Sequence, residues 1–100
     1  MVMEINEEQF EEKIKGERVL MDCFAPWCGP CKMIAPVIEE LSNEIKDVEF
    51  YKLNVDDADE ISEKYGIMSI PTIMYFENGE LKNRTVGFQT KEELKKLINN

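Results

Sequence analysis

The chain contains no histidine and only three cysteines in 100 residues. A structural zinc site needs four cysteine or histidine ligands, so this chain is one ligand short. An iron–sulfur cluster meets the same shortage, because Cys23, Cys28 and Cys31 match three positions of the plant-type spacing and a fourth cysteine is missing. An odd number of cysteines also argues against a secreted scaffold stapled by disulfide bonds. We therefore expect no bound metal and no cofactor.

Basic residues are also scarce. Twelve Lys and Arg residues stand against 21 Asp and Glu residues, which gives a formal net charge of −9. This charge repels phosphate backbones, and affinity for nucleic acid depends on Lys and Arg, so we expect no nucleic-acid partner. The chain lacks an apolar run that could span a bilayer, and residues 1–8 lack the features of a signal peptide. We expect a monomeric cytoplasmic protein that does not act at a membrane.

Repeats, low-complexity stretches and Ser/Gly linkers are absent, so residues 1–100 should form a single domain around one core. Residue pattern and composition predict five strands, over Met1–Ile5, Val19–Ala25, Val48–Val55, Thr72–Phe76 and Glu80–Val86. Capping residues and apolar spacing predict four helices, which begin after Asn6, at Cys28, near Ala58 and at Thr90. The first three should end at Gly16, near Asn43 and at Gly66, with a kink at Pro36 in the second.

The order of these elements is βαβαβα followed by ββα. It predicts parallel strands with right-handed crossovers, closed by an antiparallel hairpin at Asn78-Gly79, with helices on both faces of the sheet. In open sheets of this kind, reactive groups lie beyond the carboxyl ends of the parallel strands. The residues that follow Val19–Ala25 occupy such a position.

Those residues are Trp27-Cys28-Gly29-Pro30-Cys31-Lys32, a pair of cysteines two residues apart. The strand before them is apolar on both faces, as in a buried strand, and the residues after them are apolar at helical spacing. Cys28 should therefore cap a helix at the end of a strand. Its thiolate would face unpaired backbone N–H groups and the positive end of the helix dipole, which lower a thiol pKa.

This placement predicts a working dithiol. Two intervening residues let both sulfurs sit on the first helical turn, close enough to form and release a small-loop disulfide. Cys28 should be the attacking sulfur, while Cys31 lies one turn deeper, where burial disfavours the thiolate, and resolves the mixed disulfide. Gly29 and Pro30 carry no charge that would stabilise the thiolate further, so they favour a reductant of protein disulfides. Oxidase or isomerase activity, or a binding module with an incidental dithiol, remains an alternative.

Asp22 is a carboxyl group inside the apolar strand, with no evident partner in the sequence. Burial should raise its pKa, so that it shuttles a proton to or from Cys31. Lys52, on the adjacent predicted strand, would modulate it. The structural alternative is a buried carboxyl that is hydrogen-bonded to backbone.

Three other residues also have structural interpretations. Cys23 is best read as a small buried hydrophobe. Trp27 either covers the core or offers a flat docking surface beside the thiol, and both roles are compatible. Pro71 by itself reads as an ordinary trans proline at the start of a strand.

The Trp27–Lys32 segment resembles the thioredoxin family, and further segments match family landmarks in the same order. They are Val19–Ala25 with Asp22, Met33–Pro36, Lys52–Asp56, Tyr65–Ile67, Ile70–Thr72, Phe76–Gly79 and Val86-Gly87. The resemblance covers essentially the whole chain. It implies the thioredoxin fold, an α/β architecture in which four helices flank a central mixed five-stranded sheet (βαβαβαββα).

The same resemblance implies the surroundings of the dithiol. A cis peptide should precede Pro71 and face the two cysteines, and Trp27, Ile70, Pro71 and Gly87 should border the substrate groove. The activity implied is that of a thiol–disulfide oxidoreductase that reduces protein disulfides. Its partners would be disulfide-containing proteins and a thioredoxin reductase that recharges the Cys28/Cys31 pair.

Overall fold

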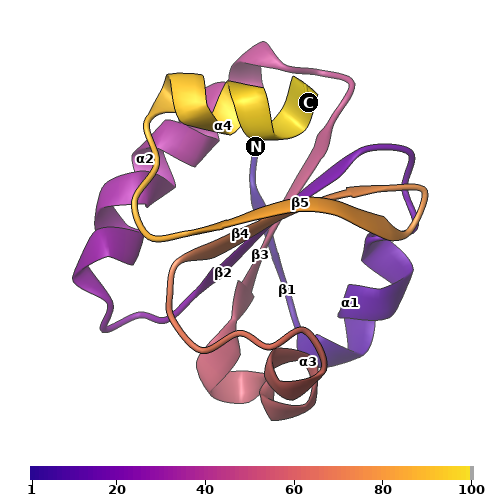
Figure 1. Cartoon of the computed structure of the whole chain (residues 1–100), viewed down its shortest axis with the longest axis vertical. Helices are drawn as coiled ribbons and strands as arrows, with labels where there is room; N and C mark the ends of the chain where they lie inside the picture. Colours follow the sequence, from indigo (N-terminus) through magenta and orange to yellow (C-terminus); the bar gives the residue numbers. More distant parts are fainter. Residues whose placement is uncertain (100) are drawn as a thin grey trace.

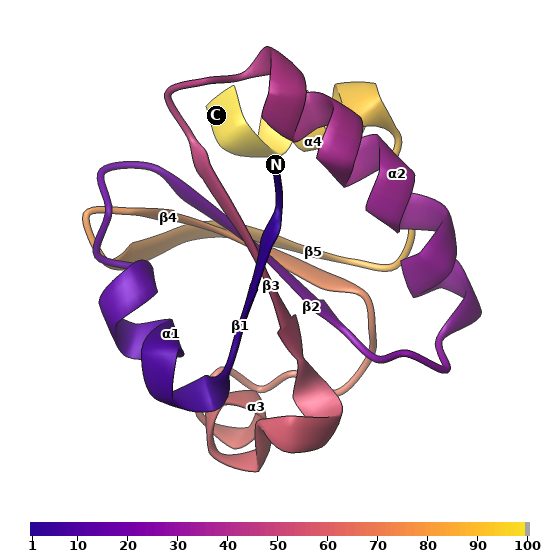
Figure 2. The same cartoon turned by 180° about the vertical axis from the view of Figure 1, so that it is seen from behind.

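The computed structural model describes residues 1–99. One five-stranded sheet has the strand order β1-β3-β2-β4-β5. The strands are β1 (Met3–Ile5), β2 (Val19–Phe24), β3 (Glu49–Asn54), β4 (Thr72–Glu77) and β5 (Glu80–Val86). The helices are α1 (Glu7–Lys13), α2 (Gly29–Glu44), α3 (Asp59–Lys64) and α4 (Lys91–Asn99), with the short 3-10 helix η1 (Val55–Asp57) after β3. Figures 1 and 2 show α2 and α4 on one face of the sheet and α1 and α3 on the other.

β2 is the central strand. It pairs in parallel with β3, which also pairs in parallel with β1, and it pairs antiparallel with β4, which continues into the β5 hairpin. Helices cover both faces, so every residue of β2 from Val19 to Cys23 is buried. The predicted fold class, element order and buried strand are therefore confirmed. The 3-10 helix is an element that the sequence pattern did not predict.

The core has one half on each face of the sheet. On the α1/α3 face, the rings of Phe10, Tyr65 and Phe76 pack with centroids 5.3 to 6.1 Å apart. On the α2/α4 face, β2, β3 and β4 bury Leu20, Phe50 and Tyr75 against apolar side chains of both helices. The predicted apolar stripe of the last helix, Leu94, Leu97 and Ile98, belongs to this second half.

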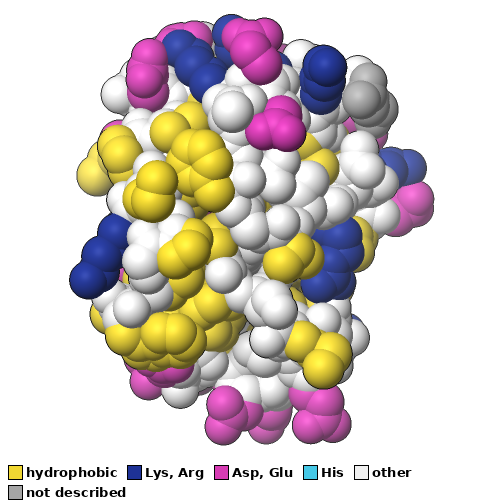
Figure 3. Space-filling model, turned by 60° about the vertical axis from the view of Figure 1, so that its left-hand side comes forward, with side chains coloured by type: hydrophobic (Ala, Val, Ile, Leu, Met, Phe, Trp, Pro, Cys, Tyr) yellow, Lys and Arg dark blue, Asp and Glu magenta, His cyan; other side chains and the backbone are white. Residues whose placement is uncertain are grey.

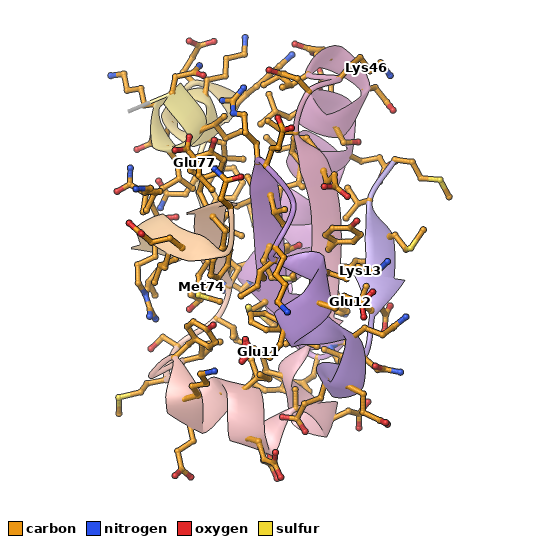
Figure 4. All side chains as sticks on the ribbon, turned by 90° about the vertical axis from the view of Figure 1, so that its right-hand side faces the viewer. Glu11, Glu12, Lys13, Lys46, Met74 and Glu77 are labelled. Carbon is orange, nitrogen blue, oxygen red and sulfur yellow. A yellow bond between two sulfur atoms is a disulfide. The ribbon has the colours of Figure 1, made fainter. Side chains whose placement is uncertain are left out.

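Polar contacts fasten α1 to α3. The Glu7 carboxylate accepts a hydrogen bond from the Ile61 amide at 2.8 Å and so caps α3, whose own N-cap residue Ala58 has no polar side chain. Glu11 lies on the side of α1 that faces α3 (Figure 4), where it pairs with Lys64. The short α3 helix is therefore held by α1 as well as by its own hydrogen bonds.

Most predicted caps and turns are present. Asn6 and Gln9 form a reciprocal capping box, and Thr90 and Glu93 form another. Asn78 and Gly79 have φ angles of +53° and +85°, as a tight hairpin turn requires.

The predicted end of the first helix at Gly16 is wrong, because α1 ends at Lys13. The backbone carbonyls of Gly16 and Glu17 accept hydrogen bonds from the Asn78 amide, so the chain leaves its helical path to meet the hairpin. A Cβ at Gly16 would displace the carboxylate of the exposed Glu49 side chain.

Three strands are one or two residues shorter than predicted: β1 begins at Met3, β2 ends at Phe24 and β3 covers only Glu49–Asn54, because Val55 already belongs to η1. Asn100, the last residue of the predicted domain, lies outside the described residues. No helix within residues 1–99 is long and apolar enough to cross a membrane.

Candidate functional site

Cys28 and Cys31 lie where β2 ends and α2 begins, and the structure holds them as a disulfide with Cα atoms 5.2 Å apart. Cys28 is the N-cap of α2, as predicted, and its sulfur accepts a hydrogen bond from the Cys31 amide at 3.2 Å. No acidic residue lies in the first turn of α2. The first cysteine is therefore placed where backbone N–H groups stabilise a negatively charged sulfur.

The two cysteines differ in their neighbours and not in the exposed fraction of each residue. Cys31 is not more deeply buried than Cys28, contrary to the expectation from the sequence, because in this disulfide form each residue is only 4% exposed. The Cys28 sulfur lies 3.8 Å from the Ile70 carbonyl oxygen, whereas Cys31 lines a cavity of about 150 Å³ that also borders Asp22 and Lys52. Cys28 therefore faces the loop before β4, and Cys31 faces the buried carboxyl group.

Asp22 is 3% exposed, and its Oδ1 has no hydrogen-bond partner within residues 1–99. The interpretation of Asp22 as a carboxyl satisfied by the backbone is therefore wrong for this oxygen. Burial raises the pKa of Asp22 to about 7, and the positive charge of Lys52, its register partner on β3, opposes the shift. A carboxyl group with such a pKa exchanges protons near neutral pH.

The segment before β4 approaches the dithiol from the other side. The Ile70–Pro71 peptide is cis, so the expectation from family resemblance is confirmed and the trans interpretation is wrong. The Pro71 carbonyl accepts a hydrogen bond from the Gly87 amide at 2.8 Å. Gly87 has a φ of +91°, a conformation that favours glycine. The Ile70 carbonyl thus lies beside Cys28, and Gly87, from a distant part of the chain, contacts Pro71.

Trp27 is 69% exposed, so the interpretation that it covers the core is wrong. Its indole nitrogen donates a hydrogen bond to the Asp56 carboxylate of η1 at 3.0 Å, which anchors one edge of the ring. Sequence reasoning assigned Asp56 no role, although its position directly after a buried parallel strand was a usable signal. Trp27 thus presents a held aromatic surface beside the disulfide.

Large apolar side chains are exposed at the start of α2, in the loop before β4 and around Gly87. Figure 3 shows hydrophobic side chains gathered on the side of the molecule where α2 begins. The large apolar residues exposed in these segments are Trp27, Met33, Met68, Val86 and Phe88. Met68 stands out at 94% exposure. A hydrophobic surface of this kind is typical of a protein-docking site.

Cys23 is fully buried and unpaired, and burial together with Asp22 raises the pKa of its thiol well above its usual range. This supports its interpretation as a small core residue. Within residues 1–99, no three Cys, Asp or Glu side chains are grouped so that they could hold a metal ion.

Comparison with known proteins gives consistent matches over the whole chain. Residues 1–100 match the family model described as Thioredoxin. The thioredoxin of Bacillus subtilis is 44% identical over 99 residues, covering 98% of this chain and 95% of that protein. The thioredoxin of Rickettsia bellii is 45% identical over 103 residues, covering 100% of this chain and 98% of that protein. A solved structure of Plasmodium falciparum thioredoxin superimposes with a TM-score of 0.89 at 37% identity, covering 97% of this chain and 96% of that chain.

The Asp22 environment predicts a pH-dependent stability. Because the folded state raises the pKa of Asp22 from its ordinary value near 4 to about 7, the folded protein binds the extra proton, and stability falls as pH rises between these values. Three pKa units correspond to a penalty on the order of 4 kcal/mol above pH 7. Asp22→Asn, which removes the charge at nearly constant shape, should therefore stabilise the oxidised protein by a few kcal/mol at pH 8 and far less at pH 4.

Urea unfolding of the wild-type and variant proteins at pH 4, 6 and 8 measures this difference. Asp57→Asn, at an exposed carboxyl group, is the matched control. A stability gain from Asp22→Asn that stays constant across this pH range would contradict the raised pKa.

Proposed function

The chain belongs to the thioredoxin family and is a thiol–disulfide oxidoreductase whose redox pair is Cys28 and Cys31, and from this premise we propose that it works as a reductant of protein disulfides. As a thioredoxin-family protein it has disulfide-containing substrates and a reductase as partners. We assign the activity to one domain, residues 1–100, acting as a cytoplasmic monomer. The observation that carries the exchange chemistry is the position of Cys28 at the N-cap of α2, one helical turn from its bonding partner, and the reducing direction is argued from Gly29 and Pro30.

In the first step, the Cys28 thiolate attacks one sulfur of a substrate disulfide. A bond forms between Cys28 and that sulfur, and the second substrate sulfur leaves as a thiolate, which takes up a proton. The Cys31 amide and the first turn of α2 stabilise the attacking thiolate.

In the second step, Asp22 takes the proton of the Cys31 thiol through the cavity that both residues line. The resulting Cys31 thiolate attacks the Cys28 sulfur, the mixed disulfide breaks, and the remaining substrate sulfur leaves. Two electrons have then passed to the substrate, and the protein is left in the disulfide form that the structure shows. Lys52 tunes this step, because its charge limits how far burial raises the pKa of Asp22.

Substrate binding is assigned to the surface around Cys28. Trp27 contributes an exposed aromatic face, and Ile70 and Pro71 contribute backbone close to the reacting sulfur. Gly87 borders the same groove and holds the Pro71 carbonyl. Since a protein substrate has to place its disulfide against Cys28, these residues would contact the chain on either side of that disulfide.

Gly29 and Pro30 support the reducing direction. Both residues are exposed and uncharged, so neither adds a charge that would stabilise the Cys28 thiolate. The stabilisation comes from the N-terminus of α2. Weaker stabilisation of the thiolate form makes the dithiol a stronger reductant. Such a dithiol has to be re-reduced in every cycle, which fits a compartment that keeps thiols reduced.

The roles of the two cysteines predict a trapped complex. Cys31→Ser should accumulate a covalent complex with an oxidised protein substrate, because Cys28 still attacks and nothing resolves the mixed disulfide. Non-reducing electrophoresis with mass spectrometry identifies the bond to Cys28. Cys28→Ser should form no complex and reduce nothing, while Cys23→Ser should behave as wild type. Absence of the Cys31→Ser complex would refute the assignment.

The proton transfer predicts a pH signature. Asp22→Asn should slow resolution of a preformed mixed disulfide at least tenfold, since general acid–base groups contribute roughly 10²- to 10⁴-fold. The loss should be largest above pH 7, where the wild-type carboxyl group is ionised. Stopped-flow release of a labelled thiol from pH 5.5 to 8.5 measures it. Equal slowing at every pH would remove Asp22 from the proton transfer.

The reducing direction predicts a low potential. Equilibration with glutathione buffers should place the pair near the value of about −270 mV found for thioredoxins and well below the value of about −180 mV of protein disulfide isomerase. Pro30→His, which adds a group able to stabilise the thiolate, should raise the potential. A wild-type value at the oxidising end would favour the oxidase or isomerase alternative.

A further inference from the structure

The loop of residues 66–71, between α3 and β4, has no helix or strand of its own, yet it carries Ile70 and Pro71 to the dithiol. Sheet hydrogen bonds do not hold it, so its position depends on contacts made by other elements. Ile67 and Ile70 pack against apolar core side chains. Polar contacts come from Arg84 of β5 and from Gly87, the residue that follows β5.

The first contact is made by Arg84, a half-buried residue of β5. Its guanidinium donates hydrogen bonds to the backbone carbonyls of Tyr65 and Gly66, the second at 3.4 Å. These carbonyls lie just after the end of α3, where helix carbonyls lack partners within the helix and a positive charge is favourable. The planar fork of an arginine suits two neighbouring acceptors, which a lysine does not match. Arg84 therefore holds the start of the loop.

The other end of the loop is held by Gly87, three residues further along the same chain segment, through its hydrogen bond to the Pro71 carbonyl. Between these points, the buried Thr72 hydroxyl donates to the Ser69 carbonyl at 2.6 Å. The loop is thus fixed at both ends from β5 and the residue that follows it, and once from β4.

Arg84 has no ion-pair partner within residues 1–99. Lys82, the other basic residue of β5, differs in this respect because it pairs with the exposed carboxylate of Glu80. The polar contacts of the Arg84 guanidinium are the two carbonyls at the start of the loop. An arginine that serves only as solvated surface charge would not be expected to converge on two adjacent carbonyls.

We propose that Arg84 is a positioning residue for substrate binding, which holds the start of the 66–71 loop so that Ile70 and Pro71 stand in place over Cys28. This inference rests on the proposed role of Ile70 and Pro71 in binding substrate. Arg84 touches neither the sulfurs nor the groove, so it acts through the loop and leaves the chemistry of the dithiol unchanged.

The kinetic test compares Arg84→Gln with Lys82→Gln, which removes a charge from the same strand without touching the loop. For an oxidised protein substrate, Arg84→Gln should raise KM about three- to tenfold, the range expected for losing one or two hydrogen bonds, with kcat within about twofold. A small aromatic disulfide, which needs little of the groove, should be reduced at the wild-type rate. Lys82→Gln should match wild type in all three measurements, and Arg84→Lys should lie between Arg84→Gln and wild type.

Hydrogen exchange tests the positioning itself, without any substrate. The Ile67 amide donates to the Ser62 carbonyl at 2.8 Å at the root of the loop, so it reports whether this junction opens. In Arg84→Gln it should exchange several-fold faster, while amides of the central strands β2 and β3 keep their wild-type protection. Uniformly faster exchange would indicate global destabilisation and overturn the proposal, as would unchanged exchange at Ile67.

A third variant separates this inference from its premise. Ile70→Ala should raise KM for the protein substrate if the loop binds substrate. If Ile70→Ala raises KM and Arg84→Gln does not, the positioning role is wrong and the proposed groove stands. If neither raises KM, the substrate role of the loop is wrong, and the role of Arg84 in substrate binding falls with it.

Discussion

The burial of β2 on both faces is the constraint on which the rest of this structure depends. Helices α2 and α4 cover one face and α1 and α3 the other, so β2 runs through the middle of the molecule and is shielded from water over most of its length. The carboxyl end of β2 is consequently held in position by the packed core, and α2 begins a few residues later. Cys28 gains the N-cap position, and hence the electrostatic environment of its sulfur, from this junction.

The same burial creates the unusual carboxyl group. Asp22 is carried into the core by the strand, and one of its oxygens lacks a hydrogen-bond partner within residues 1–99. Its burial raises its pKa, so ionising it costs folding free energy. An apolar residue at position 22 would avoid this cost in folding free energy. The side chain that carries this cost in folding free energy, Asp22, lines the same cavity as Cys31. The stability of the fold and the proposed proton transfer therefore depend on the same carboxyl group.

Elements distant in the sequence complete the site. Trp27 is anchored by Asp56 of η1, and the 66–71 loop is held by residues of β4 and β5 together with Gly87. Each of these hydrogen bonds is accepted by a backbone carbonyl or a single carboxylate. Ile67 and Ile70 of the loop also pack against apolar core residues. The rim of the site is therefore positioned by directional hydrogen bonds together with apolar packing.

Local patterns predicted much of this protein because their physics is local. Asn6 with Gln9, Thr90 with Glu93, and Asn78-Gly79 each satisfy backbone groups within a few residues, and the alternation of elements indicated helices on both faces of the sheet. The first helix ends before Gly16, where the Gly16 and Glu17 carbonyls accept hydrogen bonds from Asn78, and the local pattern contains no sign of this contact with the distant hairpin. The contact of Arg84 with Tyr65 and Gly66 was equally invisible, since it depends on how β5 lies against the end of α3.

The sequence by itself determined the kind of chemistry, because a Cys-x-x-Cys pair at a strand-to-helix junction, with no histidine and too few cysteines for a metal centre, leaves thiol–disulfide exchange as the main use of those sulfurs. It also placed a carboxyl group in the central strand. Only the tertiary structure decided that both cysteines are equally buried in the disulfide form, that one oxygen of Asp22 is unpartnered and that Trp27 is exposed. Exposure and hydrogen-bond partners depend on which elements pack together, and no short stretch of sequence contains that information.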